Sequence, residues 1–325
     1  MPTERIGVNG MTEELRQYYS MKMLSVAQLD TLYEQFANKQ GIPANQGKSI
    51  NWRRFEKITI TEGSYTLTEG TAPAATSATI SSVVATISQY GQYSELSDVL
   101  TTQAIDPILT QYSERYGLAI KEGRDIVVRA ELSNATTIQY ADSQIQVGTS
   151  GTGAVGSGSY LDAAEILEAK RTLRRAGAKP FPGMGYICLI HPDNDKDLKE
   201  DADIVDNLQY ADVRGGGNPL ISGADTWKWS GVTFIVNNNL KLNASNGMSG
   251  ADTYEVVMFG QDFYGMTELN ALSAQVIVHP KGTGGHTDPL DQKSTVGWKT
   301  ALAAKVLNNN FGLLIQCASS RSNAA

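Results

Sequence analysis

The segment Thr287–Asn308, TDPLDQKSTVGWKTALAAKVLN, allows two interpretations that lead to different folds. Its first half contains Asp288, Asp291, Lys293 and Ser294, residue types that occur together in catalytic sites. Its second half is an apolar run around Trp298, which is typical of a buried structural element. The segment is therefore either part of an active site or a strand of a scaffold, and the rest of the chain decides between the two.

The composition predicts a globular chain and argues against DNA binding through overall charge. The 325 residues suffice for one large or two smaller domains, with 41% apolar and 19% charged residues. A net charge of −7 repels phosphates. Cys188 and Cys317 both lie in apolar runs, which predicts buried reduced thiols rather than a disulfide or a metal site.

Targeting signals are not evident in the sequence. No apolar run reaches the length of about 18 residues that a membrane-spanning helix needs. The first residues lack the apolar core of a secretion signal. We therefore expect synthesis in a cytoplasm and no contact with a membrane.

The first hundred residues predict a helical arm and then a long β-hairpin. Large apolar residues recur every three or four positions between Leu15 and Phe36, as in an amphipathic helix. Ser49–Thr61 and Thr79–Tyr90 predict two strands joined by a small, polar segment. An isolated two-stranded ribbon is marginally stable in water, so this hairpin needs a surface to lie on.

A long helix is predicted at residues 107–132. Asp106 is a good N-cap, Pro107 suits the first helical position, and apolar residues keep helical spacing as far as Leu132. Such a helix makes about seven turns and is roughly 40 Å long. It exceeds the usual helix length and is expected to act as a spine.

The rest of the chain alternates helices and strands and then becomes rich in strands. Ser159 is predicted to cap a helix over Tyr160–Ala176, which has acids early, bases late and Gly177 after it. The predicted strands are YICLIHP, GVTFIVN, YEVVMFG, AQVIVHP, VGWKTALAAKVL and FGLLIQC. These elements indicate a mixed α+β fold.

The motif GTGAVG, residues Gly151–Gly156, matches the dinucleotide-binding pattern G-x-G-x-x-G but not its context. The segment before it is not a buried parallel strand, and SGS separates it from the next helix. We predict a surface loop that binds no nucleotide.

A calcium site is considered at Asp193 and rejected. Acids fall at the first, third and fifth positions of a calcium loop, but Leu198 and Ile204 stand where glycine and glutamate are required. A strand that ends at His191, followed by an acidic helix that opens with Pro192, explains the sequence better.

Catalytic residues are not predicted either. His286 has Asp288 and Asp291 nearby, but the nucleophile motif G-x-S-x-G is absent from the sequence. Trp227 and Trp229 could stack on a sugar or a base, although aromatic residues two apart on a strand more often pack on one face of a sheet.

Several blocks of sequence occur in one order between Met11 and Cys317. They are INWRRFEKI, LTEGTAP, ATISQYGQYSELSDVL and AIDPIL, then AKRTLRRAGAKPF and YICLIHPD, then MFGQDFYGMTEL and DPLDQKSTVGWKTALAAKVLN. Together they resemble the major capsid proteins of tailed bacteriophages of the N-four type. The first ten residues, the loop near Gly151 and RGGGNPLISGADTWKWSG depart from that resemblance.

The resemblance implies the Hong Kong 97-like capsid fold. Its parts would be an N-terminal arm at 1–48, an extended β-hairpin loop at 49–91, a peripheral domain at 92–159 and 271–325 with the spine helix at 107–132, and an axial domain at 160–270. The segment Thr287–Asn308 then becomes the return crossing into the peripheral sheet, not an active site.

The resemblance also implies roles for particular side chains. The expected core of the peripheral domain is Tyr112, Tyr116, Val296, Trp298, Leu302 and Val306. The expected contacts with a neighbouring subunit lie on the hairpin, at Trp52, Arg53, Arg54, Phe55, Tyr65 and Glu69. Side chains alternate along a strand, so Arg53 and Arg54 are expected to face opposite ways.

The function that the resemblance implies is an icosahedral shell of hexamers and pentamers around double-stranded DNA. The expected location is the virion, after assembly in the host cytoplasm, and the expected partners are a scaffolding protein, a portal and possible decoration proteins. No catalytic residue, cofactor or metal is expected. A cellular nanocompartment shell of the same fold and a nucleotide-binding enzyme remain as alternatives.

Overall fold

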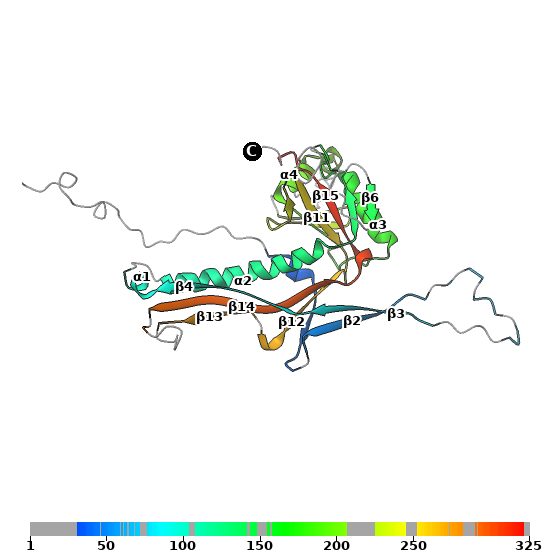
Figure 1. Ribbon diagram of the computed structural model, residues 1–325. Helices are drawn as coiled ribbons and strands as arrows, with labels where there is room; N and C mark the ends of the chain where they lie inside the picture. Colours follow the sequence, from blue (N-terminus) through cyan, green and yellow to red (C-terminus); the bar gives the residue numbers. More distant parts are fainter. Residues whose placement is uncertain are drawn as a thin grey trace, which may run out of the picture.

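The computed structural model describes residues 31–45, 47–58, 60, 62–63, 65–67, 69–71, 77–103, 108–141, 144–147, 155–156, 158–206, 225–244, 252–272, 274–281, 290 and 292–321. In these residues the chain forms an elongated part, a ribbon that projects from one end of it, and a compact part beside it (Figure 1). Several predictions lie outside the described residues: the arm helices before residue 31, the helix start at Asp106 and Pro107, residues 151–154 of the glycine motif, and the group His286, Asp288, Pro289 and Asp291.

The centre of the elongated part is β14, Lys293–Val306. One of its edges pairs antiparallel with β4, Ser88–Ser97, from Lys293 to Leu302. Its other edge is shared by β13, Gln275–His279, and β12, Tyr264–Leu269. The short strand β1, Asn38–Ile42, adds to β12 in parallel. The segment Thr287–Asn308 is therefore a sheet strand along most of its length, as predicted.

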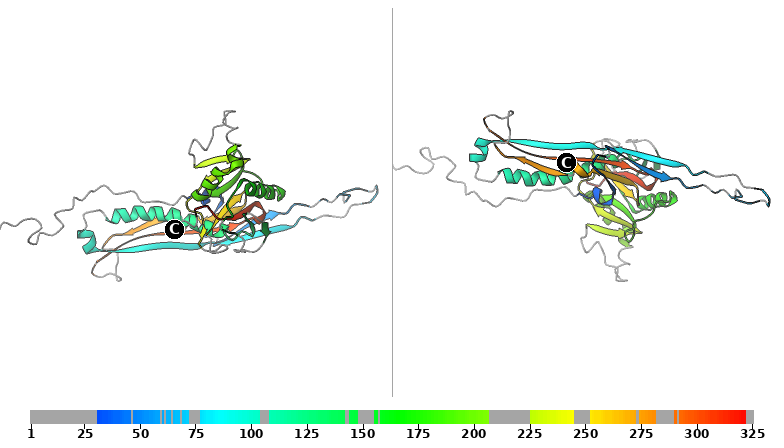
Figure 2. Two further views of the ribbon diagram at one scale, coloured as in Figure 1. Left: turned by 90° about the horizontal axis from the view of Figure 1, so that it is seen from above. Right: turned by 90° about the horizontal axis from the view of Figure 1, so that it is seen from below.

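The spine helix α2, Ile108–Leu132, lies along one face of this sheet (Figures 1 and 2). A side chain at Gly123 would meet the ring of Trp298 at 3.1 Å, so the glycine lets the helix approach β14 closely. Leu96, Tyr116 and Val296 form a small buried cluster under the helix. The predicted long helix is confirmed over its described residues.

The predicted core residues of this part differ in burial. Val296 and Leu302 are fully buried, Tyr116 is nearly so, and Trp298 and Val306 are partly buried. Tyr112, also expected in the core, is 38% exposed. The reason is its position near the start of α2, where only the small cluster around Tyr116 is enclosed.

The ribbon consists of β2, Ser49–Phe55, and β3, Ile80–Thr86, paired antiparallel as a two-stranded sheet. Its strands are shorter than predicted. Tyr90 belongs to β4 instead, because the chain passes directly from β3 into the long sheet and pairs there with β14.

An eight-stranded sheet forms the compact part, in the order β6-β5-β15-β11-β7-β9-β8, with β10 also on β11. The strands are β5 Thr137–Tyr140, β6 Gln144–Val147, β7 Tyr186–Ile190, β8 Thr226–Trp229, β9 Val232–Val236, β10 Leu242–Asn243, β11 Thr253–Phe259 and β15 Gly312–Cys317. The shorter elements elsewhere are α1 Asp98–Gln103 and the 3-10 turns η2 Tyr33–Phe36, η4 Asn270–Leu272 and η6 Asn309–Phe311.

Two helices pack on one face of the compact sheet, α3 Ala163–Arg175 and α4 Pro192–Glu200. The N-cap of α3 is Asp162, whose carboxylate accepts the Glu165 N–H at 2.9 Å, so the prediction of Ser159 as the cap was wrong. Gly177 follows α3 with a φ of 77°, as expected for a helix stop. The helix that opens with Pro192 after His191 is confirmed.

Sheet membership differs from the predicted domain boundaries at four strands. β5 and β6, expected with the peripheral residues 92–159, lie in the compact sheet. β15, expected with the peripheral residues 271–325, lies between β5 and β11 in the compact sheet. β12, expected with the axial residues 160–270, pairs with β14 in the long sheet. The chain thus crosses between the two parts more often than its order of elements indicates.

The contact between α2 and β14 gives a first prediction. Replacing Gly123 with valine forces methyl groups against Trp298, and we expect a loss of about 1–3 kcal/mol in the free energy of unfolding. Gly117 lies in the same helix with nothing within 4 Å of the added carbon. Gly117→Val should therefore leave stability unchanged or slightly raised. Urea unfolding of the unassembled chain measures both, and equal effects would contradict the close-approach argument.

Candidate functional site

The ribbon has one face turned to its own chain and one face turned outward. The register pairs Trp52 with Val83 on the inner face and Phe55 with Ile80 on the outer face. On the outer face Phe55 is 72% exposed, Ile80 56% and Val84 53%. The ribbon therefore presents apolar side chains to solvent on the side that its own body leaves open.

Trp52 anchors the root of the ribbon to the body. Its ring lies over Gly265 of β12, where an added side-chain carbon would meet it at 3.1 Å and Leu307 at 3.2 Å. A hollow of about 330 Å³ beside this contact is lined by Trp52, Val83, Leu307, Phe311 and polar neighbours. Trp52 packs against its own chain, and its predicted contact with a neighbouring subunit stays a prediction.

The two arginines of β2 face opposite sides, as predicted from strand alternation. Arg53 shares the outer face with Phe55 and pairs in register with Ser82. Arg54 forms an ion pair with Glu56 at 2.6 Å. Hydrogen bonds from Ser81 and Arg54 lower the pKa of Glu56. Of the two cations, Arg54 is thus already engaged within the ribbon.

Beyond β2 the ribbon carries exposed apolar residues toward its tip. Ile60 is 70% exposed, Tyr65 65% and Leu67 70%. Glu62 and Glu69 are exposed beside them. Figure 1 shows this segment far from the body, so the described parts of the chain provide no cover for it.

A charged joint fixes the compact part to the elongated part. The Arg124 guanidinium on α2 lies 2.6 Å from Glu34 of η2 and 2.9 Å from Glu268 of β12. The neighbouring Asp125 is fully buried and accepts the Glu34 N–H at 3.2 Å and the Asn239 side-chain amide at 3.0 Å. Helix, N-terminal segment, long sheet and compact part therefore meet at one place.

The pKa values at this joint shift in opposite directions. Burial raises the pKa of Asp125, although hydrogen bonds from Asn239 and from backbone N–H groups oppose the shift. Burial alone would also raise the pKa of Glu34, but its hydrogen bond and ion pair with Arg124 outweigh it and the pKa is lowered.

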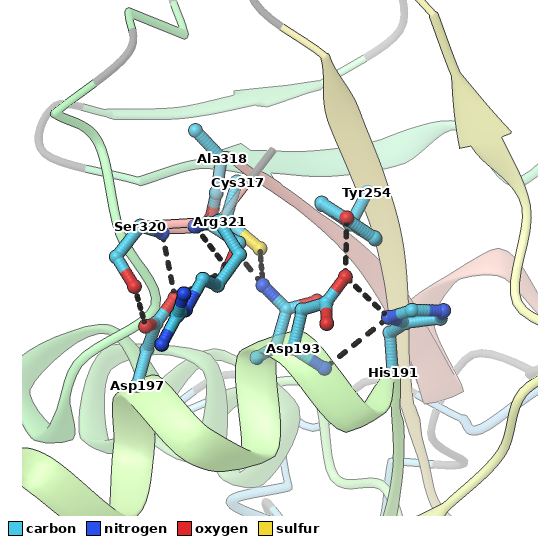
Figure 3. A network of polar contacts seen from close by, with 10 residues as sticks. His191, Asp193, Asp197, Tyr254, Cys317, Ala318, Ser320 and Arg321 are labelled. Atoms are coloured by element: carbon cyan, nitrogen blue, oxygen red, sulfur yellow. Dashed lines mark hydrogen bonds and ion pairs between the residues drawn. The ribbon is translucent and has the colours of Figure 1, made fainter. Parts of the chain in front are cut away.

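The acids once considered as a calcium loop instead fasten α4 to its surroundings (Figure 3). Asp193 accepts the Tyr254 hydroxyl at 2.6 Å and lies 3.2 Å from the His191 ring. Asp197 accepts the Ser319 hydroxyl at 2.8 Å and the Ser320 N–H at 3.0 Å. The carboxylates therefore have structural partners on β11 and at the end of the described chain.

The same region contains other groups that were singled out in the sequence. Burial lowers the pKa of His191, which stays near Asp193 and against the Tyr254 ring. Trp227 is buried and stacks on Phe234, as expected for a tryptophan on a sheet face. Cys188 and Cys317 are buried and free.

The described residues contain no group of three or more His, Cys, Asp or Glu side chains placed to hold a metal ion. None of the described helices has the length and apolar character needed to cross a membrane.

Comparison with known proteins assigns this architecture to a family. A family model described as phage capsid protein matches residues 80–309. The chain belongs to the phage capsid protein family. The match spans β3, the long sheet except β1, the spine helix and the compact part except β15. No curated protein matches the sequence.

Solved phage capsids share the fold along nearly the whole chain. The capsid of cyanophage P-SCSP1u matches with a TM-score of 0.69 at 15% identity, covering 98% of this chain and 99% of that one. The cyanophage Pam1 capsid matches with a TM-score of 0.73 at 14% sequence identity, and the match covers 96% of this chain and 99% of that one. The capsid of Helicobacter pylori bacteriophage KHP30 matches with a TM-score of 0.71 at 10% sequence identity, and the match covers 98% of this chain and 100% of that one. The chain has the Hong Kong 97-like capsid fold, as predicted.

The charged joint gives a second prediction. Arg124→Met removes the guanidinium that lies closest to Glu34 and Glu268 and leaves Glu34 with Lys39 at 3.6 Å, and we expect a loss of about 2 kcal/mol in stability at pH 7. Because the pKa of Glu34 is lowered in the folded chain, its contribution is present above the ordinary glutamate pKa and is lost as pH falls through the folded value. The cost of the substitution should therefore shrink below about pH 4.

The matched control for this measurement is Arg175→Met, since Arg175 is exposed at the end of α3. We expect it to change stability by no more than about 0.5 kcal/mol at either pH. Denaturant unfolding at pH 7 and pH 3.5 compares the two variants. A cost at Arg124 that does not depend on pH would contradict the ion-pair account.

Proposed function

We propose that this capsid protein assembles as hexamers and pentamers into a closed icosahedral shell that encloses double-stranded DNA. The observation that carries the proposal is the ribbon, whose outer face and tip expose Phe55, Ile80, Tyr65 and Leu67 with no cover from the body. A two-stranded ribbon of this kind is marginal alone, so a neighbouring copy is its natural support.

Within this proposal the hairpin residues divide into two groups. Arg53, Phe55, Tyr65 and Glu69 are placed to contact a neighbouring subunit, because they lie on the outer face or near the tip. Trp52 and Arg54 serve instead to hold the ribbon to its own body and to itself, as their contacts with Gly265 and Glu56 indicate.

We further propose a revised domain assignment. The long sheet with α2 is the peripheral domain, and it includes β12. The eight-stranded sheet with α3 and α4 is the axial domain, and it includes β5 and β15. The contacts of Arg124 and Asp125 then lie at the joint between the two domains.

The proposed surroundings are those of a virion. Assembly would take place in the host cytoplasm with a scaffolding protein and a portal, and decoration proteins are possible additions to the finished shell. The net charge of −7 suits a container that encloses DNA without binding it tightly. A structural role without catalysis is consistent with acids such as Asp193 and Asp197 serving as anchors.

Electron microscopy of chain co-expressed with its scaffolding protein tests the proposal. We expect closed shells that sediment far faster than the monomer and that contain DNA when the packaging proteins are present. Shells filled with cellular protein would favour the nanocompartment alternative. A folded chain that remains monomeric under these conditions would overturn the shell function.

The outer face of the ribbon gives a third prediction. Arg53→Glu should leave the melting temperature of the monomer unchanged, because the side chain is exposed on the outer face of the ribbon and pairs in register with Ser82. Shell yield should nevertheless fall, since removing one partner of an interface ion pair can cost about 2–5 kcal/mol. Sedimentation of co-expressed protein measures the yield, with Arg175→Glu as the exposed control. Normal yields from Arg53→Glu would leave Arg53 as a solubilising charge only.

A further inference from the structure

The end of α3, at one edge of the compact part (Figure 1), carries a local excess of positive charge. Residues 168–185 contain five lysines and arginines and a single carboxylate, Glu168, in a chain whose net charge is −7. That carboxylate pairs with Arg171 on the same helix. Four cations of this region form no ion pair with a carboxylate of the described residues, and we call them the basic cluster: Lys170, Arg174, Lys179 and Lys228.

A hollow of about 430 Å³ opens beside the basic cluster. Lys170 and Arg174 line one wall, and glycines at 177, 185 and 231 contribute backbone without side chains to the rest. The described lining contains no carboxylate. An anion that enters the hollow can therefore approach both the cations and the main chain.

The other two members of the cluster lie on segments that border the hollow. Lys179 is exposed and stands between the lining residues Ala178 and Pro180. Lys228 is exposed on β8 and donates to the carbonyl of Gly183, in the loop that continues into the lining. Arg175 points about 100° away from Arg174 around the helix, so it does not belong to the cluster.

The shape of the hollow is fixed by contacts of Lys170. Its Nζ donates to the main-chain carbonyl of Ser230 and, at 3.2 Å, to the Ser230 hydroxyl. Ser230 and Gly231 form the two-residue turn between β8 and β9, with φ values of 50° and 77°. The turn is thus tied to α3. An ammonium group has three donors, so Lys170 keeps one N–H for a ligand.

The chemistry of the hollow fits a phosphate backbone better than a base or a protein segment. Tyr186 is the aromatic residue of the lining and is buried, so it gives a base no face to stack on. The lining also has no exposed large apolar side chain to anchor a docked protein. Cations on a helix, a loop and a strand instead suit a ligand that carries a charge at every repeat, as DNA does.

We propose that the basic cluster binds the phosphodiester backbone of the enclosed double-stranded DNA without reading its sequence. This inference rests on the proposed shell function, and it places the end of α3 on the inner face of the shell. Four cations give a weak contact in one subunit, and a shell repeats that contact in every copy. The acidic net charge of the chain limits binding elsewhere on its surface.

Binding of a fluorescent duplex of mixed sequence to the unassembled chain tests the contact without shells. We expect binding at low salt, with a slope of log affinity against log salt concentration of about −3 to −4, because each neutralised phosphate contributes about −0.9. Arg174→Gln with Lys179→Gln should lower the affinity at least about tenfold and make the slope shallower by about 2. The matched control is Lys48→Gln with Lys121→Gln, which removes two exposed charges outside the compact part and should change neither quantity.

Two results of this assay would overturn the proposal. One is duplex binding that survives Arg174→Gln with Lys179→Gln, or that falls equally in the control, in chains whose circular dichroism is unchanged. The other concerns polyglutamate, which stands for an acidic protein segment. If it displaces the duplex at a lower concentration of charges than unlabelled DNA does, the partner of the cluster is a protein.

The orientation of the cluster is tested in shells. Ala176→Cys places an exposed thiol at the end of α3, and the two native cysteines are buried. A bulky polyethylene-glycol maleimide should modify this thiol in the unassembled chain but not in intact shells. Equal rates in both would put the cluster on the outer face and overturn the contact with enclosed DNA, while leaving the shell function intact. Absence of shells would instead overturn the proposed function, since duplex binding is measured without them.

Discussion

The elongated part depends on one strand that is paired along both edges and covered by a helix. β14 bonds to β4 on one side and to β13 and then β12 on the other. The helix α2 can lie close to it only because Gly123 leaves room for Trp298. The ribbon and the joint with the compact part are both positioned relative to this strand, so an error in its register would displace each of them.

The joint between the two parts contains a fully buried aspartate, Asp125, next to the partly buried ion pairs of Arg124. Attraction between ions is stronger where water is excluded, and the cost of an unpaired ion is also higher. Asp125 is fully buried among N–H donors, whereas Arg124 lies between two carboxylates that are 25% and 39% exposed. Asn239 of the compact part donates to Asp125, so a displaced compact part would remove a donor from a buried carboxylate.

Local elements were predictable from the sequence, but their partners were not. The periodicity of α2 and the apolar runs of β7, β11 and β15 indicate helix and strands directly. Nothing local shows that β15 pairs with β5 or that Trp52 packs on Gly265, because both depend on residues far away in the chain. The joint left one weak signal in the sequence. Asp125 lies three residues before Val128, which places its charged side chain on the same helix face as a buried apolar residue.

The exposed ribbon has a consequence for how stability should be understood in this protein. If another copy covers its apolar face, as proposed, the ribbon gains its order by association, and its free energy then follows mass action. In that arrangement the stability of the ribbon depends on protein concentration, whereas the stability of the body does not. Dilution would loosen the ribbon first, well before the sheet around β14 unfolds, so a single melting temperature cannot describe both.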